Sequence, residues 1–412
     1  MFTAPPAGAS SSQPQFQLFV AKIALSLFLI SGSGFLGFLP IGNVLRLIFI
    51  VLQVTIAFYG IGIAFIRQHI VVASLSLIMM LAIPFYAYVF SMAARQPFVP
   101  VSGGDYLPIG LTSLFYLVLR NGQGQDLVRF LMRVSAIYAV AYILLWAGVT
   151  FGLVHPADGA KIVLKSGGDT ERGDRIALLS CFIIFGMFCA TASFVRSLRF
   201  LALVQIALFA ICLFLSGSRL ISAMTILAFG LYLVTQTSQL VRTVFFPIFL
   251  IGFLTTCFMI ITHSFNPFDS FVNENTRFGD VSAWARWKDI ALTNALIPDH
   301  WVFGLGLPNG VEGYGPITHV NYFYTQDIGI LGVFMTFGVF GLLLYGFICF
   351  AACFGSDKLQ IDPIMKIGLN LTGAVLAVYS LLAPVFTGSA IPFAALFMAL
   401  VFWQPASFEV EN

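Results

Sequence analysis

Charged side chains are scarce in this chain. They make up 9% of its 412 residues, with 20 lysines and arginines against 17 aspartates and glutamates. Soluble domains carry about 25% charged residues, so the composition excludes a chain divided into soluble domains. The formal net charge of +3 is small, and no basic run concentrates it. We therefore expect no nucleic-acid partner.

Motifs for metals and for nucleophilic or phosphate chemistry are also missing. The chain has no HExxH, no DxD, no GxSxG and no phosphate-binding P-loop. Its cysteines lie in apolar stretches without CxxC spacing, which is typical of small buried hydrophobes. They are Cys181, Cys189, Cys212, Cys257, Cys349 and Cys353. We predict neither a metal nor a cofactor.

The first residues lack the features of a signal peptide. No lysine or arginine precedes Lys22, and no cleavage site of small residues follows a charged region. This pattern predicts a short disordered tail.

Apolar runs fill most of the chain, since hydrophobic residues make up 59% of it. A helix needs about 20 apolar residues to cross the hydrocarbon core. The sequence therefore predicts an all-α fold, a single polytopic membrane domain over residues 1–412. Twelve spans fit: 17–38, 44–66, 70–90, 106–120, 133–154, 176–195, 200–216, 220–237, 243–262, 328–351, 366–384 and 387–403. Eleven is the alternative, because only Val385 to Ala390 separates the last pair.

Short loops give the orientation, because lysine and arginine accumulate on the cytoplasmic side. With both termini in the cytoplasm, the inner turns carry Arg67, Arg120, Arg129, Arg133, Arg196, Arg199, Arg242, Lys358 and Lys366. The outer short loops carry Arg46, Arg95 and Arg219, and the two longer loops, 155–175 and 264–324, also fall outside.

The long loop from Ser264 to Tyr324 is mostly polar, and such a loop suggests chemistry at the membrane surface. Asp280 or Ser282 can cap a helix that runs to about Leu296 and ends at Pro298. Trp284, Trp287 and Ala291 share one face of this helix, which favours a position flat in the interface. The glycines and prolines of 304–316 favour turns over regular elements.

Three groups of residues in this outer region can carry chemistry. The first is Ser216-Gly217-Ser218-Arg219, where hydroxyl donors and a guanidinium suit a phosphate. The alternative is an arginine that snorkels at a helix end. The second is Arg286 beside the tryptophans, either a second phosphate clamp or a surface residue paired with Asp289.

The third group is His319, with Asn321 and Asp327 after it. Histidine is the side chain most easily poised as a base near neutral pH, although a lone loop histidine is more often only polar surface. The basic residues of loop 155–175, Arg175 among them, can contribute charge towards an anionic substrate. The other interpretation of that loop is a solvated segment of mixed charge.

Together these features resemble the O-antigen ligase and polysaccharide polymerase superfamily of bacterial envelopes, over nearly the full length of the chain. The family has about twelve spans, cytoplasmic ends and a long periplasmic loop between the ninth and tenth spans. It ends a span with SxSR, opens its loop helix with arginine and tryptophan, follows with GxG, and closes with histidine, asparagine, an acidic residue and glycine. The matching positions are Ser216, Ser218, Arg219, Arg286, Trp287, Gly304, Gly306, His319, Asn321, Asp327 and Gly329.

The chain departs from the family pattern at two places. The family arginine stands about one turn before the tryptophan, whereas Arg286 directly precedes Trp287, which leaves Arg277 as a rival. The family histidine is followed directly by asparagine, whereas Val320 intervenes here.

The resemblance implies a GT-C-like, metal-independent glycosyltransferase of the bacterial inner membrane. Its donor would be an oligosaccharide linked to undecaprenyl diphosphate, with the lipid lying against the spans. Arg219 and Arg286 would hold the diphosphate, and His319 would orient or deprotonate the acceptor hydroxyl. Ser216, Ser218, Arg277, Trp287, Asn321 and Arg175 would bind substrate, and a chain-length regulator protein is a possible partner.

Three functions and a purely structural role stay open. The chain is a polymerase if the acceptor is another lipid-linked repeat unit, which we favour, and an O-antigen ligase if the acceptor is the lipid A-core. A lipid-linked oligosaccharide flippase is the alternative from another class. Transporters place ionisable residues and broken helices near the middle of the membrane, whereas here almost every charge is predicted at a span end or in a loop. A purely structural role would leave Arg219, Arg286 and His319 individually dispensable.

Overall fold

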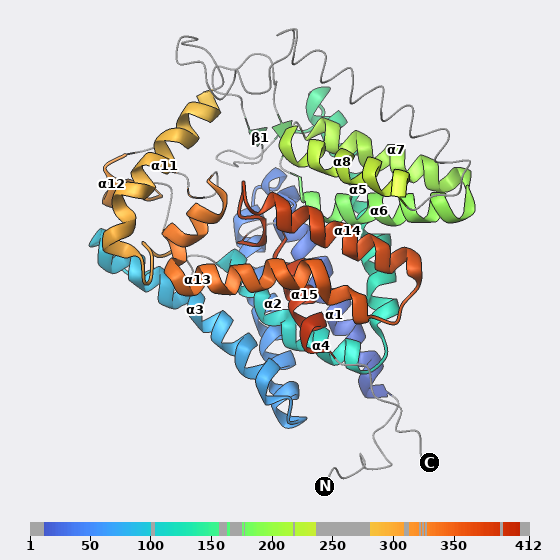
Figure 1. Cartoon of the computed structure of the whole chain (residues 1–412), viewed down its shortest axis with the longest axis horizontal. Coiled ribbons are helices and arrows are strands. Elements are labelled where there is room, and N and C mark those ends of the chain that lie inside the picture. Colours follow the sequence, from blue (N-terminus) through green and yellow to red (C-terminus); the bar gives the residue numbers. More distant parts are fainter. Residues whose placement is uncertain are drawn as a thin grey trace.

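The described chain is almost entirely helical, as predicted (Figure 1). This computed structural model describes residues 12–99, 104–155, 163–164, 175–176, 178–216, 219–235, 281–308, 313–320, 323, 325, 328–387 and 390–403. The α-helices are α1 (Ser12–Gly32), α2 (Gly42–Ile66), α3 (Ile70–Ala94), α4 (Thr112–Arg120), α5 (Gly124–Thr150), α6 (Ser180–Ser197), α7 (Phe200–Leu215), α8 (Arg219–Thr235), α11 (Val281–His300), α12 (Gly315–Thr318), α13 (Gly329–Phe354), α14 (Pro363–Tyr379) and α15 (Ile391–Phe402).

Short 3₁₀ helices and one pair of strands complete the described elements. The 3₁₀ helices are η1 (Phe35–Phe38), η2 (Gly104–Leu111), η4 (Gly355–Lys358) and η5 (Val385–Thr387). The strands β1 (Val163–Leu164) and β2 (Arg175–Ile176) pair antiparallel, with Val163 opposite Ile176.

Six helices in the described part of the chain are long and apolar enough to cross a membrane. They are Gln13–Gly32, Gly42–Ile66, Ile70–Ala94, Gly124–Thr150, Ser180–Ser197 and Gly329–Asp357. Four shorter apolar helices accompany them: Phe200–Leu215, Ile221–Leu233, Pro363–Tyr379 and Ile391–Phe402. Within a bilayer only helices and closed barrels pair every backbone group internally. The protein is an α-helical membrane protein.

Each predicted span that the structure describes overlaps at least one helical element. The span predicted over 106–120 consists of η2, which contains Pro108, followed by α4. Helix α5 begins at Gly124, before the predicted 133, because its first turns are polar and hydropathy marks only the apolar part. The predicted disordered tail of seventeen residues is wrong over Ser12 to Gln17, which belong to α1. Its residues 1–11 and the span 243–262 lie outside the described residues, so the number of spans stays a prediction.

Two short helices whose side chains are buried all around lie in the interior of the protein. All residues of α15 from Ile391 to Leu400 are buried, as are those of α4 from Thr112 to Leu119. A helix without a polar face belongs in the interior of a bundle. The ring of Phe393 meets Phe182 of α6 edge to face, with centroids 5.3 Å apart, so the long helices surround this pair.

Hydrogen bonds tie the turns at one end of the bundle together, and we name this the Gln17 end. Asn121 Nδ2 donates to Gln17 Oε1 at 2.6 Å, and Arg67 Nη2 donates to Gln13 Oε1 at 3.0 Å. Arg67 Nη1 also donates to Asn121 Oδ1 at 3.4 Å. The turns after α2 and α4 therefore lie beside the start of α1, and that this end faces the cytoplasm stays a prediction.

The opposite end, which we name the Arg46 end, gathers the predicted outer segments. Arg46 of α2 pairs with Asp105 of η2 at 2.5 Å. Leu179, just before α6, lines the same cavity as these two residues. Tyr142 of α5 donates to the carbonyl of Ile176 at 3.0 Å, which holds the strand pair at this end.

The described part of the long loop folds onto the ends of α3 and α13. A small apolar cluster joins Phe90 of α3, Met335 of α13 and Leu305, Tyr314 and Phe323 of the loop. The predicted loop helix exists as α11, but its predicted end at Pro298 is wrong. Pro298 cannot donate to the carbonyl four residues before it, but the helical backbone still continues for two more residues, to His300.

Candidate functional site

The predicted phosphate site begins where α7 ends. Ser216 is 5% exposed and donates its hydroxyl to the carbonyl of Leu213 at 2.7 Å. Ser222 of α8 donates to the same carbonyl at 3.3 Å. These hydroxyls satisfy the free carbonyl of a helix end. Arg219 is the first residue of α8, its side chain lies outside the described atoms, and Ser218 lies outside the described residues.

The loop arginine stands on α11. Arg286 and Trp287 belong to its first two turns, and their side chains lie outside the described atoms. Asp289, the alternative partner of Arg286, is 3% exposed. The rival Arg277 lies outside the described residues, so the choice between the two arginines stays a prediction.

His319 ends the short helix α12 with an exposed side chain. Its backbone is left-handed, with φ 56°, and its N–H donates to the carbonyl of Gly315 at 2.8 Å. Histidine is one of the residues that tolerate this conformation. Asn321 and Asp327 lie outside the described residues. At Arg175, which pairs with Leu164 in the strand pair, only the backbone is described.

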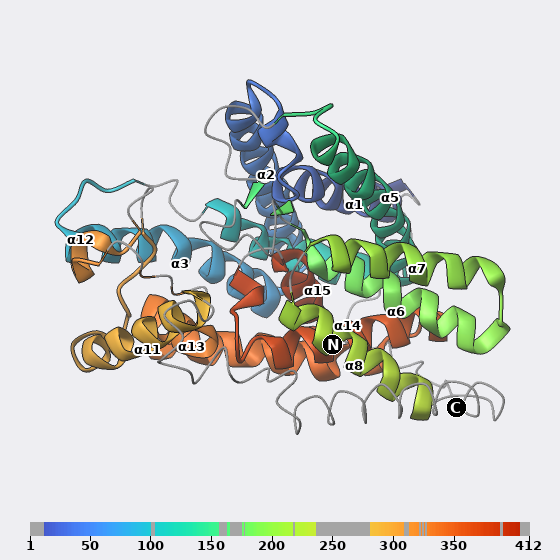
Figure 2. The same cartoon turned by 90° about the horizontal axis from the view of Figure 1, so that it is seen from above.

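The structure brings two of the three predicted catalytic positions into one unit and leaves the third in another. Helices α11 and α12 share the apolar cluster of the long loop through Ile290 and Ile317. By contrast, α8 packs on α6 and α14. Figures 1 and 2 both show α8 with α6 and α7 on one side of the molecule, and α11 and α12 on the other. Because the side chains of Arg219 and Arg286 lie outside the described atoms, a site shared by these two residues and His319 stays a prediction.

Sequence reasoning missed a break in α13 and the segment that fills it. Gly338 has φ 63° and ψ −162° inside this helix, so the expected continuous span over 328–351 is interrupted. Residues 301–307, which we call the strap, lie against the break. The main-chain bonds that fix it are Leu305 N to Met335 O (2.7 Å), Gly306 N to Thr336 O (2.9 Å), Leu307 N to Tyr86 O (2.9 Å) and Val339 N to Trp301 O (2.9 Å).

These bonds explain why the helix can be broken inside the protein. A kink frees carbonyls that normally accept within the helix, and buried carbonyls need partners. The strap supplies two N–H groups, and the hydroxyl of Tyr86 donates to the carbonyl of Phe337 at 2.8 Å. The prediction of turns over regular elements in 304–316 is confirmed for the described residues 304–308 and 313–314, which form no helix or strand, and is wrong at α12, a single helical turn that contains Pro316.

A neutral hydroxyl cluster lies behind the strap. Tyr314 donates to the carbonyl of Gly306 at 2.7 Å and lies 3.0 Å from Thr336 Oγ1. Thr336 Oγ1 in turn donates to Thr325 Oγ1 at 3.3 Å. Burial raises the pKa of Tyr314 well above its usual range, so this phenol stays neutral. The cluster can fix the loop, but it offers no charge for catalysis.

An apolar cavity of about 90 Å³ lies next to the break, between α3, η2, α13 and α15. Its walls include Ile83, Val333, Phe337, Leu344 and Ile348. Such a cavity suits a hydrocarbon group. Among the residues that the structure describes, no three His, Cys, Asp or Glu side chains form a group that could hold a metal ion.

Comparisons with known proteins identify no relative. No protein-family model matches the chain, and neither a curated protein nor a solved structure matches it.

Proposed function

We propose that the protein is a bacterial membrane glycosyltransferase of the polysaccharide polymerase type. In this proposal it lies in the inner membrane with twelve spans, both termini in the cytoplasm and the Arg46 end in the periplasm. It joins repeat units that are linked to undecaprenyl diphosphate. Its partners are this lipid-linked oligosaccharide, membrane lipid and a chain-length regulator protein. A ligase that transfers the glycan to lipid A-core uses the same donor and stays the close alternative.

The observation that carries the proposal is the folded loop at the Arg46 end. A loop that only joins two spans needs no structure of its own, whereas here main-chain bonds from Leu305, Gly306 and Leu307 lock the loop to two helices. The strand pair lies at the same end of the bundle, bonded to Tyr142 of α5. The apolar cavity beside Phe337 supports the proposal, because it offers room for part of a lipid substrate.

The proposed reaction moves a glycosyl group from phosphate to a hydroxyl. The acceptor oxygen attacks the anomeric carbon as the bond to the diphosphate breaks, and the acceptor proton passes to His319. Arg219 and Arg286 stabilise the negative charge that grows on the leaving undecaprenyl diphosphate. Since α8 and α11 belong to different units of the fold, the lipid-linked diphosphate would have to bridge them.

One observation favours a second candidate, a lipid-linked oligosaccharide transporter. Transporters use discontinuous helices near their substrate, and α13 is discontinuous at Gly338. If the protein is an enzyme, the break in α13 serves only to bind the strap and so to hold the long loop in place. In a transporter the strap would have to leave α13 during each cycle.

The product that accumulates in a deletion strain tests these alternatives. A polymerase defect leaves single repeat units on their lipid carrier at the periplasmic face. A ligase defect leaves full-length polymer on the carrier, and a transporter defect leaves single units at the cytoplasmic face. Normal polymer of normal length in the deletion strain would overturn the proposal.

A further inference from the structure

A second cavity at the Arg46 end has the groups of a binding site. It measures about 150 Å³ and lies between α1, α2 and η2. Arg46, Ile50 and Gln53 of α2 line one side, at a spacing of four and three residues that places them on one helix face. Phe28, Ser31 and Gly32 of α1 line the facing side in the same way, and Asp105, Pro108 and Leu179 complete the cavity.

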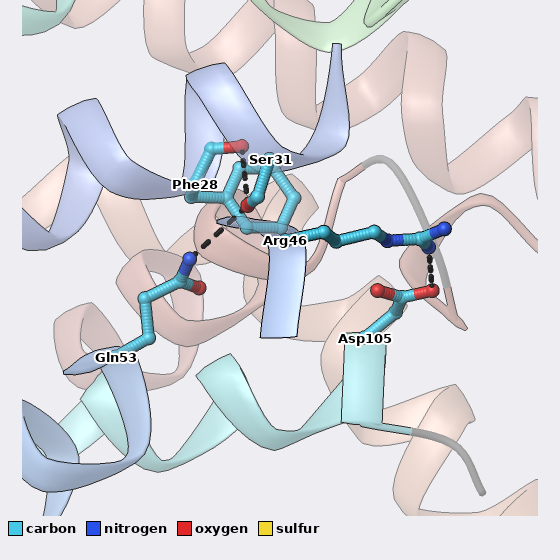
Figure 3. A network of polar contacts seen from close by, with 5 residues as sticks. All are labelled: Phe28, Ser31, Arg46, Gln53 and Asp105. Atoms are coloured by element: carbon cyan, nitrogen blue, oxygen red, sulfur yellow. Dashed lines mark hydrogen bonds and ion pairs between the residues drawn. The ribbon is translucent and has the colours of Figure 1, made fainter. Parts of the chain in front are cut away.

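Gln53 leaves one hydrogen-bond acceptor unused at the bottom of this cavity. Its side chain is 1% exposed, and no described group donates to its Oε1 atom. Figure 3 shows how the amide is oriented. Ser31 Oγ donates to the carbonyl of Phe28 at 3.2 Å and therefore accepts from Gln53 Nε2 at 3.1 Å. The amide nitrogen thus faces Ser31, and the oxygen is left for another donor.

The mouth of the cavity is polar but electrically balanced. Arg46 and Asp105 form an ion pair, and their side chains are 49% and 54% exposed. Because the two charges compensate each other, they favour a neutral ligand over an ion. Each partner still has hydrogen-bonding capacity, since guanidinium carries five donors and carboxylate accepts at two oxygens.

The size and lining of the cavity narrow the ligand further. A protein cavity of about 150 Å³ holds a benzene-sized ring. Phe28, Ile50 and Leu179 offer apolar contacts to the faces of such a ring, while Gln53, Arg46 and Asp105 offer hydrogen bonds to its substituents. A buried unpaired acceptor costs stability, and a hydroxyl on the ring would satisfy it.

We propose that this cavity binds one neutral, polyhydroxylated six-membered ring, a single sugar unit. A ring hydroxyl would donate to Gln53 Oε1, and further hydroxyls would contact Arg46 and Asp105 at the mouth. That the ring is part of a lipid-linked glycan rests on the proposed function. The binding of the ring itself follows from the groups that line the cavity.

Saturation-transfer NMR on the purified full chain tests the site directly. The protein is kept in lauryldimethylamine oxide, because sugar-based detergents would compete for the cavity. The probes are D-glucose, D-galactose, D-mannose and L-rhamnose, with benzyl alcohol as a ring of the same size that carries one hydroxyl. At least one sugar should receive saturation from the protein more strongly than benzyl alcohol does.

Two variants and one control separate binding from folding. Gln53→Leu removes the acceptor and leaves Ser31 bonded to Phe28, so the protein should fold and bind the sugar roughly tenfold more weakly. Gly32→Leu keeps Gln53 and fills the cavity, since a Cβ there points at Phe28 and Leu179 with ordinary contacts of 3.4–3.5 Å. Gln17→Leu removes another buried amide, at the opposite end, and should leave binding unchanged.

The outcomes distinguish this site from the proposed function. The site is overturned if no sugar binds, if benzyl alcohol binds better than every sugar, or if both cavity variants bind like the unsubstituted protein. If the sugar binds as expected while the deletion strain makes normal polymer, the site stands and the polymerase proposal fails. If deletion stops polymer synthesis and the purified protein binds none of the probes, the polymerase proposal stands and the site fails.

Discussion

Gly338 and Val302 approach each other so closely that a side chain at position 338 has no room. A Cβ built on Gly338 would lie 2.1 Å from the carbonyl oxygen of Val302. The φ angle of Gly338, 63°, is also one that residues with a side chain rarely adopt. The break in α13 and the position of the strap therefore depend on the same glycine.

Replacing Gly338 by alanine should destabilise the protein strongly. This backbone conformation, which is essentially restricted to glycine, and the overpacking together cost about 2–6 kcal/mol, and the backbone of Val302 cannot move aside as a flexible side chain can. The matched control is Gly346→Ala in the same helix, where a Cβ meets nothing within 4 Å. Alanine there should be neutral or stabilising by up to about 1 kcal/mol. Thermal unfolding midpoints in detergent measure both, and equal midpoints would contradict the close packing of the strap.

The hydroxyl of Tyr314 should matter more than that of Tyr345, although both residues are 3% exposed. Tyr314→Phe removes the donor to Gly306 and the contact with Thr336, which should cost about 1–3 kcal/mol. The Tyr345 hydroxyl makes no hydrogen bond of good geometry among the described groups and at most a weak one to Ser380, so Tyr345→Phe should cost less than Tyr314→Phe. Unfolding midpoints test the pair, and limited proteolysis shows whether the first variant loosens the long loop. Equal effects of the two substitutions would show that the cluster does not hold the strap.

The sequence predicts the helices well because their signal is local. The run from Ile391 to Leu400 is apolar on every side, and this alone places it inside the bundle. The start of α11 was predictable because Asp280, a residue that can cap a helix, directly precedes Val281 in the sequence. The break at Gly338 was not, because its cause is the carbonyl of Val302, in a segment far away along the chain.

The candidate sites were predictable only as positions along the chain. The order of the predicted spans places Arg219 and His319 at the same end of the bundle. It does not predict that α8, which begins at Arg219, packs on α14, whereas α12, which precedes His319, packs on α3. The only feature of the sequence that indicates the cavity at Gln53 is weak: the spacing of Arg46, Ile50 and Gln53 places them on one helix face. Its other side comes from α1, and no local pattern reports that contact.

The stability of the protein should fall as the pH decreases through the range of His69. Burial, and then the positive charges of Arg120 and Arg67, lower the pKa of His69 below its ordinary value of 6.5. The unfolded chain therefore takes up a proton on this histidine at a higher pH than the folded protein does. The contribution of neutral His69 to the free energy of unfolding is therefore fully present above pH 6.5. It is lost as the pH falls from 6.5 towards the lowered pKa of the folded protein.

Unfolding midpoints between pH 8 and pH 5.5 measure this dependence. His69→Gln should flatten the part of the profile below pH 6.5. Arg120→Gln should reduce it without abolishing it, because burial is the larger cause of the shift. A profile that His69→Gln leaves unchanged would assign the pH dependence to other groups.

The two proposed arginine clamps should be needed for polymer synthesis and not for folding. Arg219→Ala and Arg286→Ala should each abolish long polymer, because losing one cation from an oxyanion-type site costs about 10²–10³ in rate. His319→Ala should do the same by removing the proposed base. Arg219→Lys and Arg286→Lys keep the positive charge but lose the bidentate contact with phosphate, so we expect partial activity from each.

Arg199→Ala provides the control, because this exposed arginine precedes α7 at the other end of the α6, α7 and α8 segment. Polymer length on gels, with protein levels in the membrane fraction, measures the series. Arg277→Ala decides between the two loop arginines, since only the arginine that contacts the diphosphate should be indispensable. If Arg219→Ala, Arg286→Ala and His319→Ala all make polymer of normal length, these residues are not catalytic, and the broken helix α13 becomes the better guide to a transporter.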